Sequence, residues 1–376
     1  MSGAPRPGPL SGVRVLELGG IGPGPYAGML LADLGADVVR VDRPGEDLSP
    51  THAVLLRGRR SVALDLKSED GRATVLDLAE RSDVLLEGFR PGVAERLGLG
   101  PQDLLAVRPA LVYGRMTGWG QEGPYAGRAG HDITYLAVSG ALEAFAGPDG
   151  RPVPPLNLLG DFGAGGMLLA FGVVSALLHA RTTGEGQVVD AAIVDGVAST
   201  TAMLQSMVAS GLWPGPRGTN LFDGGAPFYR CYRTSDDRWV AVGAVEPHFW
   251  GRVLTGLGLG AAEVDELVGR QLDRSAWPQV ADRLAVAFAG RTRDEWAAHF
   301  ADRDACVAPV LSLAEAAQDP HLAARGTYLP DPGGSGPTQP GVVPRFSRAP
   351  GTRPDDGLGT GRPTRPGLPG MDGTEE

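Results

Sequence analysis

The feature that most constrains this sequence is a strand, loop, helix and strand pattern within its first 41 residues. Residues 13–18 alternate as a half-buried strand does, and residues 37–41 form a second apolar run. Between them, a Gly/Pro loop over 19–25 leads into helically spaced apolar residues over 26–34, and Gly35 is a typical helix stop. Because a helical crossover makes the two strands parallel, this unit predicts an α/β fold.

The same alternation of strands and helices continues to residue 213. We expect a helix over 71–81, strands over 83–87 and 111–116, an apolar helix over 161–180, a strand over 187–193 and a helix over 196–213. The uncharged apolar run inside the 161–180 helix has 17 residues, which is shorter than a usual membrane span. We therefore predict a buried helix and no membrane association.

The pattern changes at residue 228, where two alternating runs flank a Ser-Asp-Asp turn and predict a β-hairpin over 228–243. Helices follow, so we predict a smaller α+β domain. The predicted organisation is a large domain whose N-terminal part is 1–200, a small domain at 225–320, a segment at 321–350 that returns to the large domain, and a Pro/Gly-rich tail at 351–376 whose last residues are disordered.

Charge and cysteine content narrow the function classes. A net charge of −10 repels nucleic acid phosphates, so nucleic acid is not an expected partner. Cys231 and Cys306 form neither a metal framework nor a redox pair, and we interpret them as small core residues in a reducing compartment. The N-terminus has no apolar signal region, so the predicted location is cytoplasmic.

A dinucleotide fingerprint is present but misleading. Gly22, Gly24 and Ala27 have its spacing, and Asp42 stands where a ribose-binding acid would. Proline at positions 23 and 25 lacks the backbone N–H groups that cradle phosphate. The loop therefore favours a tight strand-to-helix turn, and an NAD(P)-dependent dehydrogenase is a less favoured alternative.

Two residues are candidates for proton transfer. His131 lies in a Gly-rich loop, where it is either a structural hydrogen bonder or a catalytic group. Asp161 opens the apolar helix, where it is either the N-cap or a carboxylic acid beside amides that stabilise developing negative charge. A third element, the basic run 57–60 followed by Lys67, is either a solvated face or a polyphosphate site.

A series of motifs in one order resembles the family III CoA-transferase superfamily, and within it the alpha-methylacyl-CoA racemase branch. The resemblance runs from about residue 9 to about 348. It is carried by segments 9–18, 22–25, 32–44, 58–67, 82–87, 130–133, 157–161, 216–220, 223–229, 242–247 and 304–310.

This resemblance implies a Rossmann-like large domain, a smaller α+β domain and a homodimer of two interlocked chains. Each active site would lie between the large domain of one subunit and the small domain of the other. The Gly/Pro loop would then belong to a CoA site rather than an NAD site.

The resemblance also implies residue roles. His131 and Asp161 match the two acid/base groups, and Glu246 matches a small-domain carboxylate that hydrogen-bonds the histidine across the dimer. The matched CoA contacts are Arg43, Leu64, Lys67, Gly88, Phe89, Arg90 and Arg96, and the matched acyl-site residues are Asp132 and Tyr135. No metal or separate cofactor is implied, because CoA is part of the acyl-CoA substrate.

The expected activity is an isomerase that interconverts (R)- and (S)-2-methylacyl-CoA thioesters by two-base proton transfer through an enolate. Such a reaction requires a raised pKa at Asp161, and we expect the enolate oxygen at the N-terminus of the 162–180 helix. The alternative is a family III CoA-transferase with Asp161 as nucleophile. Histidine at 131, and Val-Gly-Ala-Val-Glu-Pro at 242–247 where transferases carry a Gly-rich loop, favour the racemase.

Overall fold

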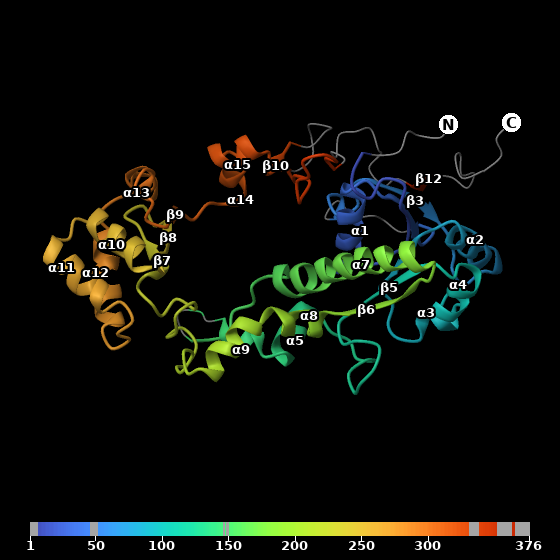
Figure 1. The fold of residues 1–376 in the computed structure, drawn as a ribbon, viewed down its shortest axis with the longest axis horizontal. Coiled ribbons are helices and arrows are strands. Elements are labelled where there is room, and N and C mark those ends of the chain that lie inside the picture. Colours follow the sequence, from blue (N-terminus) through green and yellow to red (C-terminus); the bar gives the residue numbers. More distant parts are fainter. Residues whose placement is uncertain are drawn as a thin grey trace. The chain divides into compact units, whose positions relative to one another are not determined.

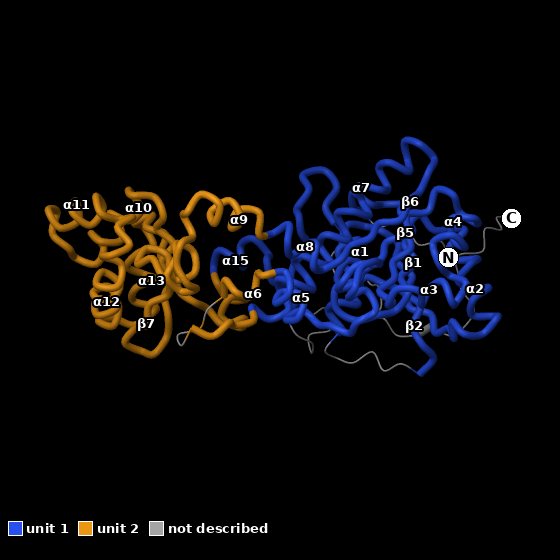
Figure 2. The backbone as a smooth tube through the Cα atoms, turned by 90° about the horizontal axis from the view of Figure 1, so that it is seen from below, with its two compact units in different colours: residues 1–139, 155–200, 320–376 blue, residues 140–154, 201–319 orange. Residues whose placement is uncertain are grey.

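A computed structural model describes residues 7–45, 52–145, 147, 150–330, 338–351 and 363–364. The chain divides into two units (Figure 2), of which unit 1 comprises 1–139, 155–200 and 320–376, and unit 2 comprises 140–154 and 201–319. Unit 2 includes residues 140–154, which the sequence analysis assigned to the large domain. Most of the predicted tail lies outside the described residues.

A parallel sheet forms the centre of unit 1, and Figure 1 labels its strands β3, β5 and β6. Its seven strands have the order β12-β3-β2-β1-β4-β5-β6. Without the two-residue edge strand β12, this is the order of a doubly wound sheet, whose switch point lies between β1 and β4. The predicted parallel α/β architecture is confirmed. The strands are β1 (Arg14–Leu18), β2 (Asp37–Asp42), β3 (Arg59–Ala63), β4 (Val84–Glu87), β5 (Val112–Thr117), β6 (Gln187–Ala192) and β12 (Pro363–Thr364).

Helices cover both faces of this sheet. On one face, Val75 and Leu78 of α2 join Leu16 and Leu85 of the strands in a buried cluster. On the other face lie α1 and α7, and Gly114 of β5 allows α7 to approach, because a Cβ there would lie 3.1 Å from Leu169. The remaining elements of unit 1 are α1 (Pro23–Asp33), α2 (Glu69–Glu80), α3 (Val93–Arg96), α4 (Pro101–Val107), α5 (Asp132–Val138), the π-helix η2 (Leu158–Gly166), α7 (Met167–Thr183), α8 (Ile193–Thr200), α15 (Pro320–Arg325), β10 (Tyr328–Leu329) and β11 (Gln339–Pro340).

The long apolar helix is only half buried. Leu169, Val173 and Leu177 of α7 face the sheet, whereas the side chains of Phe171 and Leu178 are 70% and 71% exposed. The prediction of a buried helix is therefore wrong for its outer face. By length and composition alone, the joined helix Leu158–Thr183 could cross a membrane, but its inner face packs on β5 and β6 as a core helix does.

Unit 2 is built on the antiparallel sheet β7-β8-β9, which contains the predicted hairpin. Its core is aromatic, with Phe228, Trp250, Trp277, Phe288 and Trp296 all buried. The elements are α6 (Ala141–Ala144), α9 (Ala202–Ala209), β7 (Tyr229–Arg233), β8 (Trp239–Gly243), α10 (Pro247–Gly256), α11 (Ala261–Gly269), α12 (Trp277–Phe288), α13 (Arg293–Phe300), β9 (Val307–Pro309) and α14 (Leu313–Ala316).

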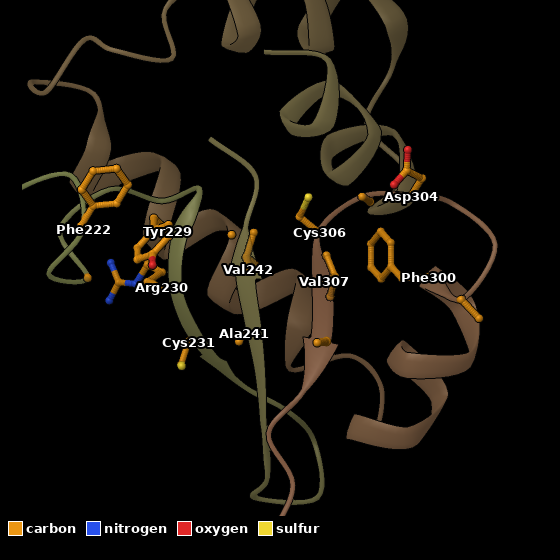
Figure 3. Close-up of a pocket in the computed structure, with 15 residues that line it drawn as sticks. Phe222, Tyr229, Arg230, Cys231, Ala241, Val242, Phe300, Asp304, Cys306 and Val307 are labelled. Carbon is orange, nitrogen blue, oxygen red and sulfur yellow. The ribbon is translucent and has the colours of Figure 1, made fainter. Parts of the chain in front are cut away.

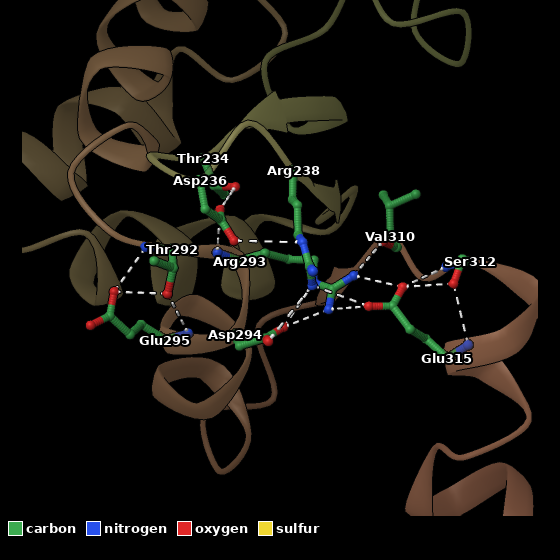
Figure 4. Close-up of polar contacts among 10 residues, drawn as sticks. All are labelled: Thr234, Asp236, Arg238, Thr292, Arg293, Asp294, Glu295, Val310, Ser312 and Glu315. Atoms are coloured by element: carbon green, nitrogen blue, oxygen red, sulfur yellow. Dashed lines mark hydrogen bonds and ion pairs between the residues drawn. The ribbon is translucent and has the colours of Figure 1, made fainter.

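A polar cluster fixes the segment by which the chain leaves unit 2 (Figure 4). Arg293 is 5% exposed, and its Nη2 donates to Glu315 Oε1 at 2.8 Å. Glu315 also accepts from the N–H of Ser312 at 2.8 Å, which caps α14. The cluster therefore joins α13 to α14.

The prediction that the two cysteines are core residues is wrong. Both Cys231 and Cys306 are free and exposed. Side chains alternate across a strand, and Tyr232 beside Cys231 takes the buried face of β7. They are therefore not core residues.

Candidate active site

The carboxyl edge of the parallel sheet collects most of the predicted CoA contacts. Loops at this edge of a doubly wound sheet, next to the switch point, are where such folds bind ligands. The exposed Arg43 follows β2, Leu64 and Lys67 follow β3, and the turn 88–90 follows β4. Arg96 ends α3, a little further along the chain.

The turn after β4 is held by a buried carboxylate. Glu87 is 2% exposed, and its Oε2 accepts from the N–H of Phe89 at 2.6 Å. Its other oxygen accepts from Nε of Arg115 at 2.8 Å. Gly88 and Arg90 therefore belong to a turn that Glu87 holds in place.

The predicted phosphate cluster is used differently. Arg57 binds Asp33, Arg59 binds Glu17, and Arg60 binds Asp37. Arg59 and Arg60 belong to β3, a strand that the sequence did not predict, and Arg57 and Arg59 are buried. For Arg57 and Arg59 neither interpretation is correct, because both neutralise carboxylates inside the fold, whereas the pair of Arg60 with Asp37 is partly exposed.

His131 lies at the N-cap of α5. Its N–H donates to Oγ1 of Thr134 at 3.0 Å, and its carbonyl accepts from the N–H of Thr134 at 2.8 Å. These two bonds fix the His131 backbone, while the residue itself is exposed. The imidazole is therefore accessible to a substrate.

Asp161 is not the N-cap of an α-helix but lies inside the π-helix η2, which continues into α7. A π-helical stretch is rare and occurs frequently at functional sites. Gly163, Gly165 and Gly166 belong to the same stretch, and Pro23 of α1 lies close to the last two, since a Cβ at Gly166 would be 2.6 Å from its carbonyl oxygen. The last two glycines therefore serve close packing against α1.

Asp132 connects the two candidate groups. Its carboxylate is 6% exposed and accepts from the N–H of Asp161 at 2.7 Å and from the N–H of Gly160. Because these amides are occupied, they cannot bind an enolate oxygen. The helix begins at Leu158, earlier than predicted, and the amides of Gly160 and Asp161 are bound to Asp132. The position of the enolate oxygen stays a prediction.

The electrostatic surroundings keep Asp161 a weak acid. Burial and the neighbouring charge of Asp132 raise the pKa of Asp161, while a hydrogen bond from Asn157 and the charge of His131 oppose the rise. Tyr135 senses the same carboxylate, because burial and Asp161 raise the pKa of its phenol, whereas Arg90 lowers it. The structure therefore brings His131, Asp132, Tyr135 and Asp161 together.

The loop after β1 borders the same carboxyl group. Gly22 has a φ of +70°, and a Cβ at this position would lie 3.6 Å from Asp161 Oδ2. Tyr26 of α1 and Phe162 of η2 pack with ring centroids 5.0 Å apart. Asp42, the acid of the apparent dinucleotide fingerprint, is buried and accepts from Arg40 and Ser61. It is therefore occupied within the fold.

Glu246 lies in unit 2, at the N-cap of α10, and is exposed. His131 and Asp161 belong to unit 1. The contact of Glu246 with the histidine stays a prediction.

Unit 2 also contains a hollow of about 740 Å³ over β7, β8 and β9 (Figure 3). Phe222, Tyr229 and Phe300 line it, together with Cys231 and Cys306. Burial, and to a smaller extent the charge of Glu246, raises the pKa of Cys306. None of the predicted site residues lines this hollow.

Comparison with known proteins gives a consistent result. The model of CoA-transferase family III matches residues 10–357. The alpha-methylacyl-CoA racemase of Mus musculus is 46% identical over 341 residues, which are 91% of this chain and 87% of the mouse protein. The succinyl-CoA–L-malate CoA-transferase alpha subunit of Chloroflexus aurantiacus is 32% identical, over 91% of this chain and 84% of that protein.

A solved structure shows the same fold. The CAIB/BAIF family protein from Brucella suis superimposes with a TM-score of 0.76 at 28% sequence identity. The match covers 93% of this chain and 96% of that one.

Proposed function

The chain belongs to CoA-transferase family III, and we propose that within this family it is a racemase of 2-methylacyl-CoA thioesters. The observation that carries the proposal is the juxtaposition of an accessible imidazole, His131, with a carboxyl group of raised pKa, Asp161. The 46% identity to the mouse racemase supports it.

The proposed reaction transfers one proton on each face of the α-carbon. Neutral His131 takes the α-proton, and the electron pair of the C–H bond moves into a planar enolate. The carboxylic acid of Asp161 then donates its proton to the opposite face, where the electron pair forms the new C–H bond. In the other direction, the Asp161 carboxylate is the base and the His131 imidazolium is the acid.

The raised pKa of Asp161 suits this exchange. An ordinary aspartate would be almost fully ionised near neutral pH and could rarely donate a proton. Burial and Asp132 raise the pKa of Asp161, so its carboxyl group is protonated more often than that of an ordinary aspartate. The protonated form is the one that can donate to the enolate.

CoA has a positioning role in this proposal. Arg43, Lys67 and Arg90 place positive charge at the carboxyl edge of the sheet, where the phosphates of CoA would bind. Binding energy from this remote part of the substrate orients the α-carbon between the two groups. CoA is therefore part of the substrate, and the proposal involves no separate cofactor.

A homodimer with a shared site belongs to the same proposal. Met167, Phe171 and Leu178 form an exposed apolar stripe along α7. A stripe of this kind on a soluble protein is typical of a covered surface. A second copy would cover it and supply Glu246 to the histidine.

CoA transfer through Asp161 is the alternative. It shares the carboxyl group and is favoured by the similarity to the Chloroflexus enzyme. It leaves His131 without a role in the transfer.

One assay separates the two reactions. The protein is incubated with a single enantiomer of a 2-methylacyl-CoA, with and without a free carboxylic acid as acceptor, and both chirality and the acyl-CoA species are followed. Racemisation that needs no acceptor supports the proposal. Transfer of CoA to the acceptor with retained chirality would replace it by the transferase.

A further inference from the structure

Four charged side chains are buried between α1 and the sheet of unit 1. Glu17, Arg40, Asp42 and Arg59 are each less than 5% exposed. Arg40 donates from Nη1 to Glu17 Oε1 at 2.8 Å and from Nε to Asp42 Oδ1 at 2.6 Å. Arg59 binds the second oxygen of Glu17.

Stability alone does not account for this cluster. Removing charges from water is unfavourable in the interior, and apolar replacements of buried ion pairs are often equally stable. Arg59 moreover keeps Nε and Nη2 buried without a hydrogen-bond partner among the residues that the structure describes. A cluster that is expensive and incompletely paired suggests a role in geometry.

The third guanidinium nitrogen of Arg40 binds the loop after β1, outside the cluster. Its Nη2 donates to the carbonyl of Gly20 at 3.0 Å. The chain passes so closely over the cluster that a Cβ at Gly19 would lie 3.1 Å from Asp42 Oδ1. The N–H of Gly19 donates to the carbonyl of Val41 at 2.8 Å, and beyond this bond the loop is held at Gly20 by a guanidinium whose other two nitrogens bind Glu17 and Asp42.

Two residues further on, the same loop reaches the proposed acid. Gly22 is in the left-handed region, and a side chain there would begin beside Oδ2 of Asp161. Pro23, the next residue, is where α1 begins, and its carbonyl lies close to Gly166 of the π-helix. A shift of the loop would therefore change both the wall beside Asp161 and the support of the turn that carries it.

We infer that Arg40 is a positioning residue for Asp161, acting through the Gly20 carbonyl and the loop that ends at Gly22. The inference rests on the proposed function and deepens it. Lysine cannot replace this arginine, because its single ammonium group lacks the fork that spans Glu17, Asp42 and Gly20 at once.

The test uses Arg40→Lys, which keeps the charge and removes the fork. Its matched control is Arg60→Lys on β3, whose ion pair with Asp37 is 36% and 41% exposed. Both variants are incubated in D₂O with each enantiomer of a 2-methylacyl-CoA, and inversion is measured separately from exchange with retention.

Exchange with retention is expected to differ between the two enantiomers. In Arg40→Lys, inversion falls about 10- to 100-fold in both directions, because a misplaced group costs this much. Exchange with retention persists for the enantiomer that His131 deprotonates and is lost for the other. Arg60→Lys behaves like the wild type.

A second variant keeps the inference testable if Arg40→Lys does not fold. Gly22→Ala adds a methyl group beside Asp161, and Gly12→Ala, at a φ of +82° with open space around it, adds the same backbone strain away from the site. We expect Gly22→Ala to lose exchange with retention for one enantiomer only, as Arg40→Lys does, and Gly12→Ala to lose it for neither.

A readout independent of the reaction separates this inference from the proposed function. The Asp161 carboxyl carbon is titrated by ¹³C NMR in each folded variant. Loss of the loop contact admits water, so the pKa of Asp161 falls toward its usual range in Arg40→Lys and stays unchanged in Arg60→Lys.

Each outcome has one meaning. If the wild-type protein never exchanges the α-proton, the proposed function is overturned. The titration of Asp161 then tests the role of Arg40 by itself. Equal losses of exchange with retention for the two enantiomers would overturn the role of Arg40. An unchanged pKa of Asp161 in a folded Arg40→Lys would also overturn it.

Discussion

At the scale of the residue, the proton affinity of Asp161 is set by its neighbours. Burial has the largest effect and raises the pKa, and Asp132 adds to it. Asp132 acts in two ways, because its carboxylate also accepts the N–H of Asp161 and thereby fixes the π-helical turn. The same residue therefore supplies charge and geometry.

The substitution Asp132→Asn separates these two effects. The introduced amide keeps an acceptor oxygen for the N–H group of Asp161 but carries no negative charge, so the pKa of Asp161 falls. We expect the acid limb of the kcat/KM profile to move to lower pH. In the proposed reaction His131 and Asp161 share one proton, so the profiles of the two enantiomers should keep one common shape.

The measurement is the pH dependence of racemisation for both enantiomers. Asp77→Asn, whose ion pair with Arg81 lies on the exposed side of α2, is the control. An acid limb that stays in place or moves upward would contradict the role given to Asp132.

At the scale of the element, local patterns predicted the β1-α1-β2 unit, since its strands and helix are set by apolar periodicity within 30 residues. The strand β3 escaped prediction because Arg59 and Arg60 look like a solvated run, and only distant carboxylates pair with them. The π-helix escaped for a similar reason. Its turn depends on Asp132, which lies 29 residues away.

The site shows the same division. The sequence singled out His131 and Asp161, but their roles came from family resemblance. The bond between Asp132 and the backbone of Asp161, and the approach of Gly22 to the carboxyl group, could not be predicted, because no local pattern encodes a contact between separate loops.

Packing between α8 and the π-helix offers a test at this scale. A Cβ at Gly196 would lie 2.0 Å from the carbonyl oxygen of Ala164, so Gly196→Ala must push the two elements apart. We expect a loss of about 1–3 kcal/mol in the free energy of unfolding, measured in urea. We also expect the racemisation rate to fall by more than this loss of stability accounts for.

Gly269→Ala is the matched control, because nothing lies within 4 Å of its added Cβ at the end of α11. It should leave activity unchanged and stability equal or slightly higher. A Gly196→Ala protein as stable and active as the wild type would show that η2 does not depend on α8.

The polar cluster of Figure 4 predicts a local effect in unit 2. Arg293 has three acceptors, Glu315, Asp294 and the carbonyl of Val310. Arg293→Met should cost about 2 kcal/mol and speed amide hydrogen exchange over residues 311–319, because a buried charge-assisted bond is lost.

Arg270→Met removes an ion pair of the same kind from the exposed surface, where Arg270 meets Asp273. Surface pairs contribute little, so this control should show no change in exchange. Identical exchange in the two variants would mean that the Arg293 cluster does not anchor α14.

At the scale of the whole molecule, the proposal joins groups from two chains. His131 and Asp161 belong to unit 1 and Glu246 to unit 2, and the apolar stripe of α7 lacks a cover within the described part of one chain. A homodimer with a shared site would account for both observations.

Complementation between inactive subunits tests this directly. His131→Gln and Glu246→Gln chains are co-expressed with different affinity tags, and the mixed dimer is purified. If histidine and glutamate meet across the dimer, one of its two sites is wild type, and racemisation returns to about half the wild-type rate per dimer. If they meet within one chain, or if no dimer forms, activity stays at the level of the single variants.

The central claim is two-base proton transfer by His131 and Asp161, and its most direct measurement is α-proton exchange in D₂O combined with chirality. The wild type should exchange and invert both enantiomers. His131→Gln and Asp161→Asn should each abolish inversion while retaining exchange for opposite enantiomers. Absence of exchange from any 2-methylacyl-CoA, or exchange in the two variants from the same enantiomer, would contradict the account.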